Sequence, residues 1–387
     1  MRPRWALALA LLALAACTER GAAAQERVRV RATHADGVPL HPEERASAVS
    51  GRLPDGAEVV VLAWGAERRW LEVRASDGAR GWISARYVAR EAPTDAAPWA
   101  SREACLAAPP PARAAGTARI ASWNLRWFPD GSSQGPSDRP TDVEWMACAI
   151  GSLGADAVGV QEVLLHERGA AAVEQLTRHL SARTGGRWRG AFDECPRDGR
   201  QHVGWLWDET RVTLTAPEQL DDVNPLGGCA GRLRPGLAAT LRYGGREVRA
   251  LVVHLDSGTH ARDRANRDRS VARIVAHARR WPRGLVLGDF NPMGGGPSGG
   301  EEERASLDAQ LAAIRWRRPA GEVGCTEIHR GRGVALDHAF VAPALGAARV
   351  EVAGVCARTC QLARGEAPPA LGALSDHCPL VVELPLR

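Results

Sequence analysis

The stretch Leu285-Val286-Leu287-Gly288-Asp289-Phe290-Asn291 is an apolar run that ends in an acid and an amide, and five other short motifs share this arrangement. In each motif an acid, amide or imidazole stands where a hydrophobic run starts or stops. The five are Ser122-Trp123-Asn124, Gln161-Glu162, His254-Leu255, Leu336-Asp337-His338 and Ser375-Asp376-His377. Together the six supply hard oxygen ligands, two imidazoles and orienting carboxylates, which metal-assisted cleavage of a phosphate ester requires.

The runs beside the motifs predict the secondary structure. Apolar runs predict strands at 157–160, 251–253, 285–287, 339–341 and 380–384, and helical spacing predicts helices over 142–153, around 173–180 and over 262–280. Helices interleaved with strands indicate α/β sheets covered by helices. Four motifs follow a strand and two precede one. Because the end of a strand lies beside the start of its antiparallel neighbour, we expect all six at one rim.

The length and charge of the chain leave room for one large domain and a small one. It has 387 residues, 25% of them charged, and a formal net charge of +5 carried entirely by arginine, since the sequence contains no lysine. The arginine bias is typical of a GC-rich genome. The small positive excess gives a mild attraction to anionic partners and is weak support for nucleic acid.

The N-terminus is typical of a targeting segment. A basic start at 1–4 precedes an apolar run at 5–13 that is too short to span a bilayer. Leu14-Ala15-Ala16-Cys17 resembles a bacterial lipoprotein cleavage site, in which Cys17 is lipidated and holds the protein at a membrane surface. We therefore expect an exported protein in the periplasm or at the cell surface. The alternative is cleavage after Ala22-Ala23-Ala24, which leaves a secreted protein.

The remaining eight cysteines predict disulfides. They are Cys105, Cys148, Cys195, Cys229, Cys325, Cys356, Cys360 and Cys378, an even number that favours disulfides in an exported chain and permits 105 pairings. Zinc is the rival interpretation. It is disfavoured because no Cys-x2-Cys pair is followed by a matching partner.

Changes in composition predict the domain boundaries. Residues 1–17 form the signal segment and 18–26 a tether, and 27–92 alternate apolar and polar residues in short strands separated by turns. Gly81-Trp82-Ile83-Ser84 near the end of this region resembles the bacterial SH3-like barrel, which implies a possible cell-wall ligand. Residues 93–117 are rich in Ala and Pro and predict a linker. Cys105 lies within it, so a disulfide could attach part of the linker to a domain. Residues 118–387 form the large domain.

The chemistry of the side chains suggests their roles. Glu162 and Asp376 are hard donors suited to Mg²⁺ or Mn²⁺. His377 can act as a general base whose tautomer is fixed by Asp337, and His254 can donate to a phosphate oxygen. Asp289 and Asn291 stand two residues apart, so both could position water or phosphate.

At these residues the chain resembles the endonuclease/exonuclease/phosphatase family, which includes deoxyribonuclease I, from about residue 118 to the C-terminus. The resemblance implies a four-layered α/β sandwich. It also implies a metal site at Asn124, Glu162 and Asp376, a phosphate contact from Arg234 in Arg232-Leu233-Arg234-Pro235-Gly236, and catalytic roles for His254, Asp289, Asn291, Asp337 and His377. The expected activity is metal-dependent phosphodiester hydrolysis, with nucleic acid as the substrate.

One branch of the family fits poorly. Abasic-site endonucleases carry an active-site Tyr between the Glu and Asp motifs, where this chain has only Tyr243, in an expected hairpin turn before Gly244-Gly245. Those enzymes also lack the His-Leu motif. Two alternatives stay open: a lipid or sugar-phosphate phosphoesterase, and a cell-wall-binding protein with an inactive sandwich. Glu301-Glu302-Glu303 predicts a solvated helix start.

Overall fold

The chain folds into two compact units that divide between Glu91 and Ala92. A computed structural model describes residues 27–30, 32, 36–65, 70–89, 97–112, 116–293, 299–362 and 367–386. The expected signal segment 1–17 with Cys17, and the tether 18–26, lie outside the described residues. None of the described helices is both long enough and apolar enough to cross a membrane.

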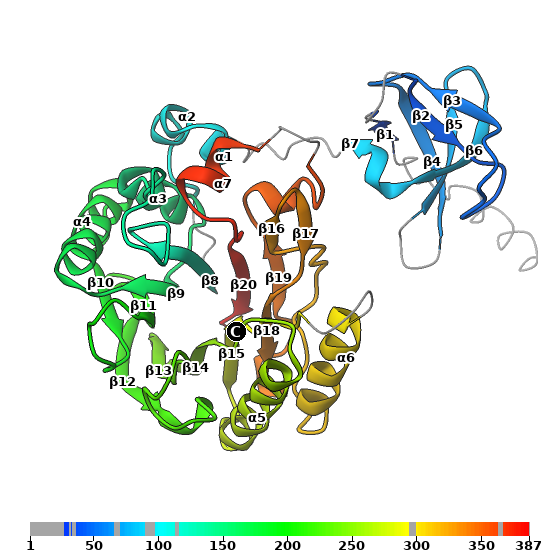
Figure 1. Cartoon of the computed structure of the whole chain (residues 1–387). Coiled ribbons are helices and arrows are strands. Elements are labelled where there is room, and N and C mark those ends of the chain that lie inside the picture. Colours follow the sequence, from blue (N-terminus) through cyan, green and yellow to red (C-terminus); the bar gives the residue numbers. More distant parts are fainter. Residues whose placement is uncertain are drawn as a thin grey trace, which may run out of the picture. The chain divides into compact units, whose positions relative to one another are not determined.

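The N-terminal unit is built of strands. Its five-stranded sheet has the order β6-β5-β4-β1-β7, and a separate hairpin pairs β2 with β3 (Figure 1). The strands are β1 Arg27–Val30, β2 Val38–Leu40, β3 Gly51–Leu53, β4 Glu58–Trp64, β5 Trp70–Ala75, β6 Arg80–Ser84 and β7 Val88–Ala89. Alternate residues such as Leu71, Val73 and Ile83 fill its core. Its likeness to an SH3-like barrel stays a prediction.

The C-terminal unit contains two large sheets. The first has the strand order β10-β11-β9-β8-β20-β19 and the second β12-β13-β14-β15-β18. The first sheet consists of β8 Thr117–Phe128, β9 Ala157–Leu164, β10 Trp188–Phe192, β11 Gln201–Asp208, β19 Arg349–Val352 and β20 Leu380–Pro385. The second consists of β12 Thr213–Leu220, β13 Gly236–Tyr243, β14 Arg246–His254, β15 Gly284–Asp289 and β18 Asp337–Val341, and a small hairpin pairs β16 Glu327–His329 with β17 Arg332–Val334.

Alternation along the strands builds four layers. In β8, Ile120 points into the core between the sheets, whereas Ala121 points into the core that covers the first sheet. In β14, Ala250 faces the inter-sheet core and Leu251 faces the core beyond the second sheet. Because both faces of each sheet are apolar, helices cover the two outer faces. The predicted α/β sandwich is therefore confirmed.

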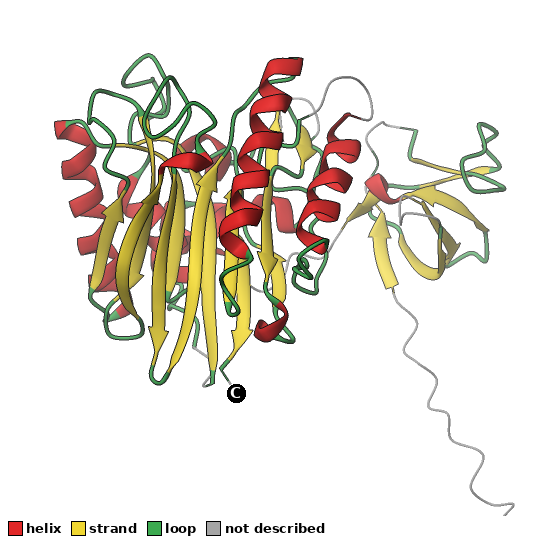
Figure 2. Cartoon of the chain, turned by 90° about the horizontal axis from the view of Figure 1, so that it is seen from below, coloured by secondary structure: helices red, strands yellow, loops and turns green. Residues whose placement is uncertain are grey.

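Helices α3 and α4 cover the first sheet, and α5 and α6 cover the second (Figures 1 and 2). The helices are α1 Ala97–Ala100, α2 Arg102–Ala107, α3 Val143–Ser152, α4 Glu167–Thr184, α5 Ala261–Ala278, α6 Gly299–Ala312 and α7 Pro369–Ala373. The three predicted helices correspond to α3, α4 and α5. Asp142 caps α3, since its side chain accepts a hydrogen bond from the Trp145 amide at 3.0 Å.

Three details differ from the sequence-based expectations. The predicted strand 157–160 extends to Leu164, because pairing with β11 resumes at Val163 and Leu164 after a register shift at Gln161 and Glu162. Helices α1 and α2 lie within the stretch that was expected to be a linker. Glu303, expected to be solvated, is 5% exposed because its carboxylate pairs with the guanidinium of the buried Arg267.

The eight cysteines of the C-terminal unit form four disulfides. The pairs are Cys105–Cys148, Cys195–Cys229, Cys325–Cys360 and Cys356–Cys378. The first joins α2, inside the expected linker, to α3, so part of that segment belongs to the C-terminal unit. The pairing supports the disulfide interpretation over zinc.

The buried Arg267–Glu303 pair gives a stability prediction. Replacing Arg267→Met leaves the Glu303 carboxylate buried without its guanidinium, which should lower the free energy of unfolding by about 3–5 kcal/mol. Chemical denaturation of the pure protein measures the loss. The double variant Arg267→Met/Glu303→Leu should recover most of it, and an equally unstable double variant would contradict the assignment to an unpaired charge.

Candidate active site

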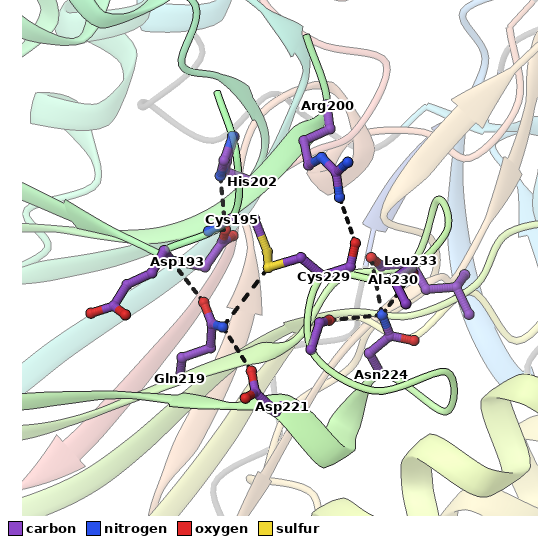
Figure 3. Close-up of a disulfide and its surroundings, with 12 residues drawn as sticks. Asp193, Cys195, Arg200, His202, Gln219, Asp221, Asn224, Cys229, Ala230 and Leu233 are labelled. Carbon is purple, nitrogen blue, oxygen red and sulfur yellow. Dashed lines mark hydrogen bonds and ion pairs between the residues drawn. A yellow bond between two sulfur atoms is a disulfide. The ribbon is translucent and has the colours of Figure 1, made fainter. Parts of the chain in front are cut away.

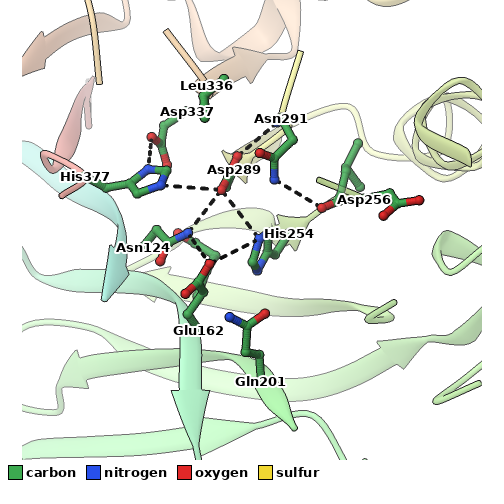
Figure 4. Close-up of polar contacts among 12 residues, drawn as sticks. Asn124, Glu162, Gln201, His254, Asp256, Asp289, Asn291, Leu336, Asp337 and His377 are labelled. Atoms are coloured by element: carbon green, nitrogen blue, oxygen red, sulfur yellow. Dashed lines mark hydrogen bonds and ion pairs between the residues drawn. The ribbon is translucent and has the colours of Figure 1, made fainter. Parts of the chain in front are cut away.

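The six motifs meet at one rim of the two sheets. Strands β8 and β9 are parallel, as are β14 and β15, and β18 and β20 run antiparallel to β15 and β8 respectively. The C-terminal ends of four strands therefore lie beside the N-terminal ends of two others. In the second sheet, Asp289 stands directly beside both His254 and Asp337. The residues brought together are Asn124, Glu162, His254, Asp289, Asn291, Asp337 and His377 (Figure 4).

Asn124 joins the carboxylates of the two sheets. Its side-chain Nδ2 donates to Glu162 Oε1 at 3.1 Å and to Asp289 Oδ2 at 3.1 Å. Asn124 is fully buried and Asp289 is 1% exposed. Because Glu162 belongs to the first sheet and Asp289 to the second, this amide connects the sheets at the centre of the site.

The backbone is strained around these groups. Of the eight described non-glycine residues with positive φ, four lie here: Arg126, Trp127, Glu162 and Asn291, with φ of 47°, 50°, 59° and 49°. Two of the four amides donate to site carboxylates: Trp127 N to Glu162 Oε2 at 3.1 Å, and Asn291 N to Asp289 Oδ1 at 2.9 Å. Such strain persists where the surrounding contacts fix it, and it is concentrated at functional sites.

Asp337 and His377 form a pair with a defined tautomer. His377 Nδ1 lies 2.8 Å from Asp337 Oδ2, so Nδ1 carries the donated proton and Nε2 is turned toward Asp289 Oδ2 at 3.9 Å. Asp337 is fully buried and His377 is 8% exposed. This geometry leaves Nε2 as the atom that can take up or release a proton.

The buried charges shift one another's pKa values. Burial disfavours a charged imidazole, but the charges of Asp337, Asp289 and Asp376 outweigh it and raise the pKa of His377 well above its ordinary value. Burial, with repulsion from Asp337, raises the pKa of Asp289 to about 7. Burial also raises the pKa of Glu162. Burial is thus the main reason that both carboxylates hold protons more tightly than they would in water.

His254 is the neutral imidazole of the site. Burial, together with the positive charges of Arg234 and His377, holds its pKa well below the ordinary value. Its Nε2 lies 3.5 Å from Asp289 Oδ2 and 3.7 Å from Glu162 Oε1. A proton on Nε2 is favoured by those carboxylates, so His254 can donate a hydrogen bond to an incoming oxygen.

These residues fit a hard divalent cation. Glu162 offers carboxylate oxygens at the centre of the rim, and the Asn124 side chain lies beside them, with its Oδ1 accepting from the Arg126 amide at 3.0 Å. Asp289, Asp337 and His377 also offer ligand atoms within 4.8 Å of one another. Asp376 is half-buried and acts on Glu162 and His377 through its charge.

Arg234 enters the site from a loop that a disulfide braces. Its Nη2 donates to the Leu255 carbonyl at 3.1 Å and its Nη1 to Gln201 Oε1 at 3.3 Å. The Asn224 amide holds the loop by donating to the carbonyls of Gly228, Ala230 and Leu233, and Cys195–Cys229 ties the loop to the β10–β11 connection (Figure 3). The position of Arg234 is thus fixed by covalent and hydrogen-bonded contacts.

Sequence reasoning missed two polar neighbours of the site. Gln201 orients Arg234, but a Gln at the start of a strand carries no sequence signal. Glu327 of β16 is half-buried and pairs through the backbone with His377, and burial raises its pKa.

Asn291 turns its amide to the Leu255 carbonyl at 3.2 Å, which places it beside the carbonyl that also binds Arg234.

No protein-family model and no curated protein sequence matches the chain. Among solved structures it is similar to an endonuclease/exonuclease/phosphatase from Bacteroides vulgatus (16% identity over 70% of this chain and 99% of that one, TM-score 0.48). It is also similar to D. rerio TDP2 in complex with a single-strand DNA product (15%, 69% and 98%, TM-score 0.46) and to the human Nocturnin catalytic domain (16%, 70% and 94%, TM-score 0.44). These likenesses concern the fold, and the side chains of the rim are the basis for function below.

The charge of the rim predicts metal binding through Glu162. Titration of the pure protein with Mn²⁺ by calorimetry should show one site, and metal should raise the melting temperature because it binds the folded state. Replacing Glu162→Gln removes a charged ligand and should raise the dissociation constant at least ~10-fold. Glu327→Gln removes a nearby carboxylate outside the Asn124–Glu162 pair and should change the dissociation constant by no more than about 2-fold. Equal affinity of Glu162→Gln and the unaltered protein would contradict the assignment.

Proposed function

We propose that this chain is an exported, metal-dependent phosphodiesterase of the endonuclease/exonuclease/phosphatase type, and that its substrate is DNA or RNA. The observation that carries the proposal is the buried rim itself. An oriented Asp337–His377 pair faces, across Asp289, a neutral His254 and a carboxylate–amide pair suited to a cation. Each group needed for hydrolysis of a phosphate diester is present on one edge.

The residues would act together in a displacement at phosphorus. Where His377 Nε2 is unprotonated, water forms a new bond to phosphorus while its proton passes to that atom, and the bond from phosphorus to the leaving oxygen breaks. Because the neighbouring carboxylates raise the pKa of His377, this form is favoured as the pH rises. Asp337 stabilises the imidazolium that forms. His254 and Arg234 donate to the phosphate oxygens. A divalent cation at Asn124 and Glu162, with Asp376 nearby, would supply charge neutralisation on those oxygens.

Two features support a nucleic acid over a small diester. Arg232 is exposed and stands two residues before Arg234, so a strand whose phosphates flank the cleaved one would meet a second cation. A lipid substrate has less support, because Trp205 is fully buried and Trp207 packs against the inter-sheet core. The two tryptophans that could have formed an exposed aromatic hairpin therefore belong to the fold.

His377 gives the direct test of the reaction. Plasmid DNA incubated with the pure protein and Mg²⁺ should be cut, and chelation by EDTA should abolish cutting. Replacing His377→Ala removes the base and should lower the rate by about 10²–10⁴-fold. His179→Ala in α4, away from the rim, is the control and should cut at the normal rate. Equal rates for all three proteins would show that His377 is not the base.

A substrate panel tests the nucleic-acid part separately. DNA, RNA, sphingomyelin and inositol phosphates are offered to the same Mg²⁺-loaded protein. Cleavage of DNA or RNA at the highest kcat/KM is the expected result. Preferential cleavage of sphingomyelin or an inositol phosphate would replace nucleic acid with a lipid or sugar phosphate. No cleavage of any member, with no metal binding, would favour a wall-binding protein with an inactive sandwich.

Export and anchoring rest on the N-terminal sequence and on the four disulfides, which form in oxidising compartments. We expect the protein in the membrane fraction of its cells, held by a lipid on Cys17, and a Cys17→Ser variant in the soluble exported fraction. An unaltered distribution of that variant would leave secretion as the better proposal. The small N-terminal unit would then serve to hold the enzyme at a cell-wall ligand.

A further inference from the structure

Thr326 binds the backbone of Asp337 and that of Cys378, the residue after His377, although it belongs to none of the six motifs. It is fully buried and directly precedes β16. Its Oγ1 accepts hydrogen bonds from the backbone amides of Leu336 at 3.0 Å and Asp337 at 2.8 Å. Its carbonyl accepts from the amide of Cys378, the residue after His377, at 2.6 Å. Thr326 therefore binds the main chain at Asp337 and next to His377.

The side chain of Asp337 has few other restraints. Its Oδ2 is taken up by His377, and its Oδ1 is buried with no hydrogen-bond partner among the described residues. The direction of the carboxylate therefore depends on where the backbone of Asp337 is held. That backbone is held on one side by its pairing with β15 and on the other by the Thr326 hydroxyl, which binds the Asp337 amide, so the hydroxyl contributes to the approach of Asp337 to His377 Nδ1.

Two disulfides hold Thr326 and His377 to the same short segment. Cys325, next to Thr326, is bonded to Cys360, and Cys378, next to His377, is bonded to Cys356. The amide of Ile328 donates to the Asp376 carbonyl at 2.9 Å, which adds a backbone contact between β16 and the last motif. Residues 356–360 thus act as a covalent bridge that fixes the spacing between Thr326 and His377.

We propose that Thr326 is a positioning residue for the Asp337–His377 pair, and that Cys325–Cys360 and Cys356–Cys378 keep it in place. The proposal rests on the proposed phosphodiesterase function. Thr326 acts through its neighbours: it contacts none of the groups assigned to substrate or metal, and it helps to fix the distance and direction from which Asp337 orients His377. Misplacement of a catalytic group by about 1 Å can lower a rate ~10²-fold, so loss of the hydrogen bonds to the Thr326 hydroxyl should lower kcat.

The test compares Thr326→Val with Thr326→Ser. Valine keeps the shape of threonine but leaves the amides of Leu336 and Asp337 without their acceptor, whereas serine keeps the hydroxyl. With DNA and Mg²⁺ we expect Thr326→Val to lower kcat by ~10–100-fold with KM within about 2-fold. Thr326→Ser should restore most of kcat. Thr141→Val is the matched control, because Thr141 is also buried but its hydroxyl has no partner among the described residues.

Two readouts separate positioning from general damage. The Nδ1 proton of His377, hydrogen-bonded to Asp337, should give a downfield proton resonance in the unaltered protein and in Thr326→Ser, and a shifted or lost one in Thr326→Val. The acid limb of the pH–kcat profile should move in Thr326→Val alone. Normal kcat and an unchanged resonance in folded Thr326→Val would overturn the proposal.

A disulfide variant keeps the proposal testable if Thr326→Val does not fold. Cys325→Ala/Cys360→Ala should lower kcat and alter the His377 resonance, whereas Cys105→Ala/Cys148→Ala, which removes the bond between α2 and α3, should do neither. Equal effects of the two pairs would overturn the proposal. An inactive unaltered protein that still shows the resonance, and loses it in the Cys325→Ala/Cys360→Ala variant, would refute the phosphodiesterase function alone.

Discussion

The burial of three carboxylates at one edge of two packed sheets is the constraint on which the C-terminal unit depends. Asp289 and Asp337 lie where water is excluded and Glu162 is half-buried beside Asp289, so like charges repel strongly there. The fold compensates with donors aimed at each of them: the Asn124 amide, backbone amides held at positive φ, and the imidazole of His377. Removing any one donor leaves negative charge that the remaining contacts do not balance.

Covalent bonds are concentrated where this repulsion acts. Of the four disulfides in the described residues, Cys195–Cys229 braces the Arg234 loop and two others flank the Asp337–His377 pair. Only Cys105–Cys148 lies away from the rim, between α2 and α3. Hydrogen bonds in strands already fix the sheets, whereas loops at a rim have no such ladder. Cross-links there limit the conformational freedom of the loops that carry the site residues.

The sequence predicted the rim because strand direction alone brings its groups together. Asn124 and Asp289 are 165 residues apart, yet each belongs to a strand whose end reaches the same edge, and that follows from apolar runs. Thr326, Gln201 and Glu303 could not be predicted in the same way. Their roles depend on which backbone amide or charged group lies opposite them, and that is decided by loop paths that leave no periodic pattern. The positive φ of Glu162 is equally invisible, since no glycine marks it.

The electrostatics of the rim bear on its dependence on metal. The whole chain carries a net charge of +5, but the centre of the rim is acidic, and a phosphate diester is itself an anion. At a few ångströms in a poorly hydrated site, repulsion between such groups would exceed the attraction offered by Arg234 alone, because Coulomb energies grow as the effective dielectric constant falls. Burial raises the pKa of both Glu162 and Asp289, and repulsion from Asp337 adds to the shift of Asp289. A divalent cation would reverse the sign of the field that the phosphate meets. A bound cation would therefore favour the proposed reaction electrostatically, whereas protonated carboxyls would no longer repel phosphate but would offer it no positive charge.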